Sequence, residues 1–416
     1  MSAPRTDGPP RVLHIVTSSM SVVLMQGQLQ YLKEAGFDVS LASSWGRELE
    51  HEAEESGTRV FGVEMARGIS PGSDVVSFWR LWRLIRRLRP DLTNVSTPKA
   101  GLLGGLAAWL NRVPCRVYTL RGLRWESAHG IQRRLLMFAD LIACRCAHLV
   151  LCVSESARKK AVATGFVNPD KILVLGAGSS NGVIASRFTA TEERLKLAAK
   201  IRQVYSIPSD APVIGFVGRL TRDKGVPELL EAHRQLHRAF PSLRLLLVGT
   251  TEREDALPCE VNEMLEADPS IVLAGQVDDP GCFYHVMDIL VLPTHREGFP
   301  NVVLEAHAAG RPVVTYDATG AVDAVVDSVN GFIVPVGEVS ALVQSITTLL
   351  NNPALAAVMG RRGFERIQLE FQPARIWSAL VQIYVRLLVE NGIPCGGIPR
   401  HLSKPYMAVN LERASR

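Results

Sequence analysis

The stretch DILVLPTHREGFPNVVLEAHAAGRPVVTY, Asp288 to Tyr316, decides the fold class of this chain. It begins with a short apolar run and ends with a β-branched one, as buried parallel strands do. Between these runs lies a turn with glycine and proline, followed by an apolar helical period that stops at Gly310. A strand, a helix and a second strand in this order are typical of a parallel sheet with crossover helices.

The same alternation continues along both halves of the chain. In the first half, strands are predicted at 11–18, 38–44, 91–97, 116–120, 148–154 and 171–176. Helices are predicted between them at 22–35, 75–88, 101–110 and 132–146. In the second half, strands are predicted at 213–218, 243–249, 271–275, 288–293, 312–316 and 331–336. The pattern predicts an α/β protein with two consecutive doubly wound domains of Rossmann-like type.

A length of 416 residues also favours two domains. The polar segment 186–212 is the expected connection, so we predict an N-terminal domain over 1–190 and a C-terminal domain over 191–375. A last helix, 376–392, should stop at Asn391-Gly392 and pack back on the N-terminal domain. Residues 393–416 are rich in proline, glycine and basic side chains and are predicted to form a loose tail.

Composition excludes several classes of protein. With 47% hydrophobic and 21% charged residues the chain is globular, and no apolar run reaches the roughly 20 residues that span a bilayer. The N-terminus lacks an apolar segment followed by a cleavage site, so we expect a cytoplasmic protein. Seven scattered cysteines do not suggest a disulfide framework, and Cys144 and Cys146 are expected to be buried thiols rather than metal ligands.

Charge is unevenly distributed between the two halves. Residues 1–190 carry a net charge of +9, and the remainder carries −4. A basic half indicates an anionic partner, such as phospholipid, a phosphorylated substrate or nucleic acid. The segment FWRLWRLIRRLRP, 78–90, concentrates this charge among tryptophans at helical spacing. It is either a core-packing helix with a solvated face or a helix that rests on anionic lipid.

Three loops of the second half are placed to bind a ligand, because ligands of open parallel sheets lie at the carboxyl ends of strands. In GFVGRLTRDKG, 215–225, Arg219 and Lys224 stand beside a helix start, where they would favour a diphosphate or would simply be solvated. In the loop after the strand 288–293, Glu297 precedes a Gly-Phe-Pro-Asn turn. Pro300 suits the first helical position, which puts Glu305 about one turn into the helix.

This second loop could use its two acids differently. One carboxylate could accept hydrogen bonds from a ribose and the other from the hydroxyls of a sugar, with turn amides directed at phosphate. A solvated helix cap is the plain alternative. The third loop, AGQVDD, 274–279, could give backbone contacts to a base through Val277.

Together these loops resemble glycosyltransferase family 4, whose members are two-domain retaining enzymes of the GT-B fold. The resemblance is carried by GRLTRDKG, by PTHREGFPNVVLEAHAAGRPVV with its E-x7-E signature, by NGFIVPVGE, and by TPKAGLLGGLAAWLNRVPCRVYTLRG and GSSNGV in the first half. It covers nearly all of residues 11–390 and is strongest toward enzymes of capsule, exopolysaccharide and lipopolysaccharide synthesis. It implies two domains that face a central cleft.

The resemblance assigns roles to residues of this chain. It places Glu297 at the transferred sugar and makes Glu305 a ribose-binding acid. The donor would be held by Arg219, Lys224, Val277, Gly298, Phe299, Pro300, Asn301 and Glu305. Because two cations and turn amides can offset the charge of a departing diphosphate, neither a metal nor another cofactor is expected. The sequence contains no D-x-D triplet, which agrees with a metal-independent donor site.

On the acceptor side the chain departs from its relatives. Where many family members have histidine after the fifth strand of the first domain, this sequence reads LRG, with Arg121. A guanidinium cannot act as a base, but it can hold phosphate or a developing leaving-group charge, so Arg121 is a catalytic candidate. Lys99, Arg124 and His129 are acceptor-binding candidates, although His129 could equally be a plain loop histidine.

The expected activity is therefore transfer of a sugar from a nucleotide diphosphate sugar, with UDP as the family-level guess, to a polyprenyl-diphosphate-linked or polysaccharide acceptor. Nucleic acid is not an expected partner, whereas the inner face of the cytoplasmic membrane is.

The alternatives are a nucleotide-sugar 2-epimerase of the same fold and a non-catalytic nucleotide-sugar-binding protein. A dinucleotide-dependent oxidoreductase is disfavoured, because HIVTSSMSV stands where G-x-G-x-x-G would follow the first strand. His233 and His237 share a helix face without a third metal ligand, so a surface helix is expected there rather than a metal site.

Overall fold

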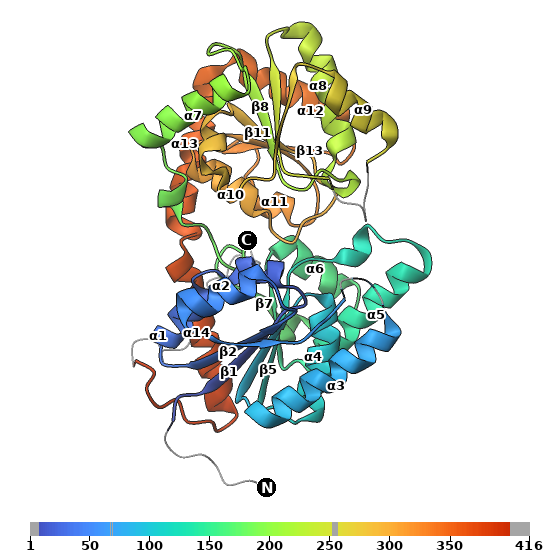
Figure 1. Ribbon diagram of the computed structural model, residues 1–416, viewed down its shortest axis with the longest axis vertical. Helices are drawn as coiled ribbons and strands as arrows, with labels where there is room; N and C mark the ends of the chain where they lie inside the picture. Colours follow the sequence, from blue (N-terminus) through green and yellow to red (C-terminus); the bar gives the residue numbers. More distant parts are fainter. Residues whose placement is uncertain (1–7, 67, 69, 252–256, 400–416) are drawn as a thin grey trace. The chain divides into compact units, whose positions relative to one another are not determined.

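The computed structural model describes residues 8–66, 68, 70–251 and 257–399. It divides the chain into two compact units. Unit 1 contains the N-terminal residues up to Asn181 and resumes at Pro373, and unit 2 runs from Gly182 to Gln372. Each unit is a parallel sheet with helices on both faces, so the predicted fold class is confirmed (Figure 1).

Unit 1 is built on seven parallel strands in the order β3-β2-β1-β4-β5-β6-β7. The strands are β1 Arg11–Ile15, β2 Asp38–Ser43, β3 Arg59–Gly62, β4 Leu92–Ser96, β5 Cys115–Leu120, β6 Leu149–Cys152 and β7 Ile172–Val174. Chain order reverses between β1 and β4, so the loops that follow these two strands open at the switch point. There, the Thr17 and Thr97 hydroxyl oxygens lie 2.6 Å apart.

Two apolar cores cover the two faces of this sheet, because successive strand residues point to opposite sides. In β1, Val12 belongs to one core and Leu13 to the other. The first core is closed by α1 Gln28–Glu34, α2 Arg47–Ser56 and α14 Pro373–Glu390. The second is closed by α3 Pro71–Leu88, α4 Pro98–Leu110, α5 Gly130–Cys146 and α6 Glu155–Ala163.

Helix α14 belongs to unit 1 although it is the last helix of the chain. It lies beside α1 (Figure 1). Its Tyr384 hydroxyl accepts a hydrogen bond of 2.6 Å from the Asn94 amide, and Asn94 accepts one of 2.8 Å from the Thr119 hydroxyl. The Tyr384 hydroxyl also lies 3.4 Å from Nε2 of His14, whose pKa burial lowers to about 3. A chain of polar contacts therefore fixes α14 on the sheet inside an apolar core.

Unit 2 is built on six parallel strands in the order β10-β9-β8-β11-β12-β13. The strands are β8 Val213–Val217, β9 Arg244–Val248, β10 Ile271–Gly275, β11 Ile289–Leu292, β12 Val313–Tyr316 and β13 Gly331–Val334. The main helices are α7 Glu192–Val204, α8 Val226–Ala239, α9 Cys259–Ala267, α10 Asn301–Ala308, α11 Ala321–Ala324, α12 Val339–Asn351 and α13 Pro353–Glu370. Here the order reverses between β8 and β11.

Three predictions about the elements need correction. The helix expected over 22–35 is two pieces, the 3-10 helix η1 Ser19–Met25 and α1, because Gly27 adopts a φ of +77° under the ring of Trp377. Strand β3 was missed, since it is a four-residue edge strand without a fully buried residue. Pro300 is not the first helical residue but the residue before it, whereas Gly310 has the φ of +72° expected just past a helix end.

The boundaries also differ from those expected. The first segment of unit 1 ends at Asn181, nine residues before the predicted end at 190, and the Val183 amide already donates to the Phe371 carbonyl of unit 2. The described part of the predicted loose tail, 393–399, is packed: Ile398 is buried in the first core of unit 1, and Ile393 and Cys395 contact that core. Residues 400–416 lie outside the described residues.

Other predictions about single residues are confirmed or refined. Cys144 and Cys146 are free, buried thiols, and burial raises the pKa of Cys144 to about 12. His233 is buried rather than on a surface, and its Nε2 lies 2.8 Å from the Ser270 hydroxyl. Within the described residues there is no group of three or more side chains suited to hold a metal ion. No helix among them is both long enough and apolar enough to cross a membrane.

Candidate functional site

The carboxyl edge of the unit 2 sheet gathers the chemistry that the sequence pointed to. The loop after β8 carries Arg219 and Lys224, and the loop after the neighbouring strand β11 carries Glu297. The two loops are joined by backbone, since the His295 amide donates to the Asp223 carbonyl at 2.9 Å. Because the strand order reverses between β8 and β11, both loops open at the switch point of the sheet.

Lys224 and Glu297 form an ion pair across these loops. The Lys224 ammonium lies 2.5 Å from Oε1 of Glu297, and the two side chains are only 13% and 18% exposed. An ammonium has three N–H donors, so Lys224 can hold Glu297 and still donate to a ligand. The structure therefore brings together a residue predicted to bind diphosphate and the acid predicted to act on the sugar.

Asp223 organises the cations around this pair. Its carboxylate accepts from the Thr221 hydroxyl at 2.6 Å and from Nη2 of Arg296 at 2.9 Å, and it lies 3.8 Å from Nη2 of Arg219. Burial alone would raise the pKa of Asp223, but the Thr221 hydrogen bond and the nearby cations outweigh burial and hold the pKa below its usual value. Asp223 is thus an ionised residue that positions two arginines.

The turn between Glu297 and α10 packs against the loop after β12. The Glu297 amide donates to the Thr319 carbonyl at 2.8 Å. Gly320, with a φ of +80°, approaches so closely that an added Cβ would lie 2.5 Å from the carbonyls of Glu297 and Gly298. The first N–H groups of a helix have no partner within the helix. The amides of Asn301 and Val302 at the start of α10 are therefore suited to bind an anion at this edge, whereas the Val303 amide donates to the Pro300 carbonyl.

Two more predicted donor residues, Phe299 and Val277, are placed differently. The Phe299 ring packs on Phe371, with 5.4 Å between the ring centres, so its side chain is structural. Val277 lies at the same carboxyl edge but after β10, the edge strand, and is half-buried. The residues that follow it form the 3-10 helix η7 Pro280–His285, whose start is capped by Asp279.

Glu305 lies on α10, where its neighbours Val303 and Leu304 are fully buried, as expected. The Tyr284 hydroxyl of η7 donates to Oε2 of Glu305 at 2.6 Å. Burial raises the pKa of Glu305, while the hydrogen bond from Tyr284 and the Arg187 cation oppose that rise. No hydrogen bond within the described structure involves Oε1 of Glu305, so this oxygen is available to a ligand hydroxyl.

In unit 1 Lys99 lies in the first turn of α4, and Arg121, Arg124 and His129 lie between β5 and α5. Nη1 of Arg121 donates to the Ser180 hydroxyl at 2.5 Å, its Nε is buried without an acceptor, and burial lowers its pKa to about 10. Lys99 forms an ion pair of 2.7 Å with Asp74 at the start of α3 and also donates to the Gly68 carbonyl, so two of its three N–H donors make structural contacts. Arg124 and His129 are exposed.

No hydrogen bond or ion pair in the described structure links Arg121 to the other three acceptor-side candidates, Lys99, Arg124 and His129. Sequence reasoning also missed Asp223, Arg296 and Tyr284. A signal existed for the first two, because Asp223 stands inside GRLTRDKG and Arg296 is adjacent to Glu297. Tyr284 gave no signal, since its approach to Glu305 exists only in three dimensions.

Two doubly wound domains, one with paired cations and acids at its switch point, define a glycosyltransferase of the GT-B fold. Comparison with known proteins agrees. Residues 198–366 match the family model "Glycosyl transferases group 1", and residues 21–178 match the "Glycosyl transferase 4-like domain". The chain belongs to glycosyltransferase family 4.

Individual relatives include a capsular polysaccharide biosynthesis glycosyltransferase of Staphylococcus aureus, 36% identical over 92% of this chain and 98% of that protein. An Escherichia coli α-1,3-galactosyltransferase that acts on an α-D-GlcNAc-diphosphoundecaprenol with UDP-Gal is 23% identical over 88% of this chain and 93% of that protein. Among solved structures, Anabaena HepE in complex with UDP and glucose has a TM-score of 0.75 at 18% identity, covering 90% of this chain and 98% of that one.

Proposed function

We propose that this protein transfers a sugar from a UDP-sugar to a polyprenyl-diphosphate-linked or polysaccharide acceptor in cell-surface polysaccharide synthesis, with retention of configuration. The observation that carries the proposal is the Lys224–Glu297 ion pair at the switch point of unit 2. The UDP-bound structure of HepE and the lipid-linked acceptor of the E. coli relative support the donor and the acceptor class.

In the proposed reaction the bond between the anomeric carbon and the diphosphate breaks, the oxygen of an acceptor hydroxyl forms the new bond, and the hydroxyl proton passes to an oxygen of the departing diphosphate. Negative charge then develops on the departing diphosphate. Lys224, Arg219 and the N-terminal amides of α10 would offset this charge, a task that requires no metal. Glu297, held by Lys224, would contact the sugar, while Oε1 of Glu305 would accept from a ribose hydroxyl.

The Arg121 guanidinium has a proposed role in the same reaction. Burial leaves its Nε without an acceptor, and a guanidinium that is desolvated in this way gains most from an anionic ligand. We assign it to a phosphate of the acceptor or of the departing group. It cannot act as a base, because it remains protonated at physiological pH.

The donor is tested by measuring UDP and GDP release by the pure protein from a panel of nucleotide sugars, with and without a polyprenyl-diphosphate-linked sugar. We expect acceptor-dependent UDP release from at least one UDP-sugar. Release of GDP alone would contradict the proposal that the donor is a UDP-sugar. Interconversion of two UDP-sugars without acceptor would establish the 2-epimerase alternative instead.

Tyr284 provides a test of the role of Glu305. Tyr284→Phe removes a hydrogen bond to a carboxylate, which contributes about 1.5–3 kcal/mol, so we expect the Michaelis constant for the donor to rise at least about tenfold with little change in turnover. Because the lost bond favours the ionised carboxylate, the pKa of Glu305 should rise, and the defect should grow as the pH is lowered. Steady-state kinetics across a pH series measures both effects.

The matched control is Tyr205→Phe, since the Tyr205 hydroxyl makes only a 3.4 Å contact, to the Ala274 carbonyl. This variant should keep the wild-type Michaelis constant. An unchanged constant in Tyr284→Phe at every pH would show that Glu305 does not need its tyrosine partner to bind the donor.

Attachment to the inner face of the cytoplasmic membrane is part of the proposal. Helices α3, α4 and α5 cover one face of the unit 1 sheet, with α4 packed against both of the others. We define the α3–α5 surface by their exposed apolar residues, which are Val75, Val76, Trp79, Trp109, Leu110, Ile131, Leu135 and Phe138. Exposed arginines stand among them: Arg80, Arg83, Arg86, Arg87, Arg112, Arg133 and Arg134. Exposed apolar side chains among cations suit the interface of an anionic bilayer.

Helix α3 has a side that packs on the core and a side that is exposed to solvent. Leu81 and Ile85 are fully buried in the unit 1 core, whereas Trp79 is 50% exposed. The Arg86 guanidinium lies over the ring of Trp82, 5.2 Å from its centre. The helix therefore packs on the sheet with one side and presents the other to solvent.

We expect wild-type protein to sediment with anionic vesicles at low salt and the triple variant Arg83→Glu, Arg86→Glu, Arg87→Glu to remain in the supernatant. Each basic residue near an anionic surface contributes about 1 kcal/mol, so three reversals should lower partitioning by at least about a hundredfold. The control reverses three exposed charges of unit 2, Lys196, Lys200 and Arg238, and should sediment like wild type. Wild-type protein that never sediments would remove membrane attachment from the proposal.

A further inference from the structure

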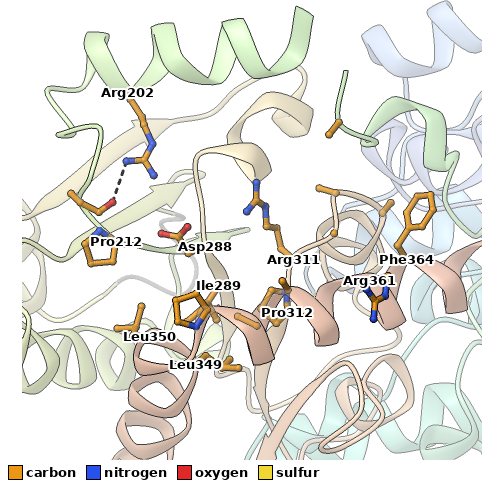
Figure 2. Close-up of a pocket in the computed structure, with 18 of the residues that line it drawn as sticks. Arg202, Pro212, Asp288, Ile289, Arg311, Pro312, Leu349, Leu350, Arg361 and Phe364 are labelled. Atoms are coloured by element: carbon orange, nitrogen blue, oxygen red, sulfur yellow. Dashed lines mark hydrogen bonds between the residues drawn. The ribbon is translucent and has the colours of Figure 1, made fainter. Parts of the chain in front are cut away.

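Unit 2 contains a cavity at the edge of its sheet opposite the donor site. Pro212, Asp288 and Pro312, each directly before a strand, line it, and its volume is about 660 Å³ (Figure 2). Ligand sites are commonly of this size. The strands between the two edges have four or five residues, which places the cavity roughly 13–17 Å from the donor site.

Arg311 is the residue in this cavity that lacks partners. Its Nε is buried without an acceptor, and its only hydrogen bond within the described structure is a long one, 3.4 Å from Nη2 to the His285 carbonyl. Burial lowers the pKa of Arg311. A guanidinium N–H that is desolvated and unpaired is unfavourable, and the Nε of Arg311 is such a group.

Two other charged residues of the cavity, Arg202 and Asp288, already have partners. Arg202 donates to three backbone carbonyls, those of Pro208, Ala211 and Val286, at 2.9–3.1 Å. Oδ2 of Asp288 accepts from the Val213 amide at 2.7 Å. Figure 2 shows Arg202, Asp288 and Arg311 around one space. Arg311 is therefore the group that a ligand would satisfy.

The chemistry of the walls defines the ligand further. Apolar side chains from the sheet and from α12 and α13 line the rest of the cavity: Ile289, Leu349, Leu350, Pro353 and Phe364. Two carboxylates, Asp210 and Asp288, are also in the lining and would repel a group with two negative charges. A planar carboxylate matches the fork of a guanidinium and carries a single charge.

We propose that this cavity is a second ligand site of the protein, for a monoanionic carboxylate attached to an apolar body. The carboxylate pairs with Arg311, and the apolar body covers the wall formed by α12 and α13. The site is separate from the donor site and does not depend on the assignment of the donor.

Isothermal titration calorimetry with three probes tests this proposal on the full-length protein. Decanoate carries both features of the ligand, acetate carries only the carboxylate, and decanamide carries the apolar body without the charge. We expect saturable binding of decanoate, with acetate and decanamide at least about tenfold weaker. The absence of saturable decanoate binding, or equal binding of decanamide, would overturn the proposal.

Two variants locate the binding. Arg311→Met removes the charge, and Ala356→Phe fills the cavity from α13 while keeping every charge; each should weaken decanoate binding at least about tenfold. Arg362→Met changes an exposed arginine of α13 outside the cavity and should bind like wild type. Circular dichroism shows that each variant is folded. If Ala356→Phe binds decanoate as tightly as wild type does, the site lies elsewhere, and this outcome remains decisive even if Arg311→Met does not fold.

Discussion

The Lys224→Met variant should bind UDP about tenfold to a hundredfold more weakly than wild type does. A charge-assisted hydrogen bond contributes about 1.5–3 kcal/mol, and the Lys224 side chain is only 13% exposed, so water screens its contact with a diphosphate poorly. Arg219 is 45% exposed, and Arg219→Met should therefore cost less affinity than Lys224→Met. Isothermal titration calorimetry with UDP gives both values, and Lys200→Met, an exposed lysine of α7, is the control.

Removing Lys224 also leaves the Glu297 carboxylate without its partner, and this could weaken UDP binding by repulsion alone. The double variant Lys224→Met, Glu297→Gln separates the two causes, because the acid is then neutral. If Lys224 contacts the diphosphate, the double variant should remain at least about tenfold weaker than wild type. Recovery of wild-type affinity in the double variant would show that Lys224 only neutralises Glu297.

Glu297→Gln should reduce turnover at least about tenfold, equivalent to about 1.4 kcal/mol, and leave UDP affinity nearly unchanged. An interaction that strengthens as charge develops at the anomeric carbon lowers the barrier, whereas one made equally in the ground state only tightens binding. Glutamine keeps an oxygen that can accept from Lys224, so the geometry of the loop should survive the change. Turnover is measured with the donor and acceptor identified by the nucleotide-release assay.

Glu305→Gln is the matched comparison, because it changes the other acid of the E-x7-E signature. Its carboxylate is fixed on α10 by Tyr284, so we expect a higher Michaelis constant for the donor and a smaller loss of turnover. Circular dichroism should first show that both variants are folded. Wild-type turnover in Glu297→Gln would mean that this acid only caps the turn.

The sequence predicted the parts of the fold that depend on local pattern. Apolar runs bounded by turns located twelve of the strands, and Gly310 marked the end of α10, because these features are set by residues close together in the chain. Strand β3 escaped because a short edge strand has no buried apolar run. The packing of Ile398 on the unit 1 core escaped because it joins residues far apart in sequence.

In the candidate site, the sequence likewise predicted single residues but not the contacts between residues that lie far apart in the chain. Lys224 and Glu297 were found from separate motifs, yet their ion pair depends on β8 and β11 lying side by side, which the order of strands along the chain does not reveal. Asp223 is recognisable as a positioning residue only when its contacts with Arg219 and Arg296 are seen. Lys99 was predicted from a family motif to bind the acceptor, whereas the structure places its ammonium in an ion pair with Asp74.

A crystal structure of the protein with UDP is the most direct test of whether Lys224 and Glu305 bind the nucleotide. We expect UDP to lie at the carboxyl edge of the unit 2 sheet. A β-phosphate oxygen should be about 2.7–3.2 Å from the Lys224 ammonium, and a ribose hydroxyl should be at hydrogen-bond distance from Oε1 of Glu305. UDP bound at this edge without a contact to Lys224, or bound elsewhere on the protein, would contradict this expectation.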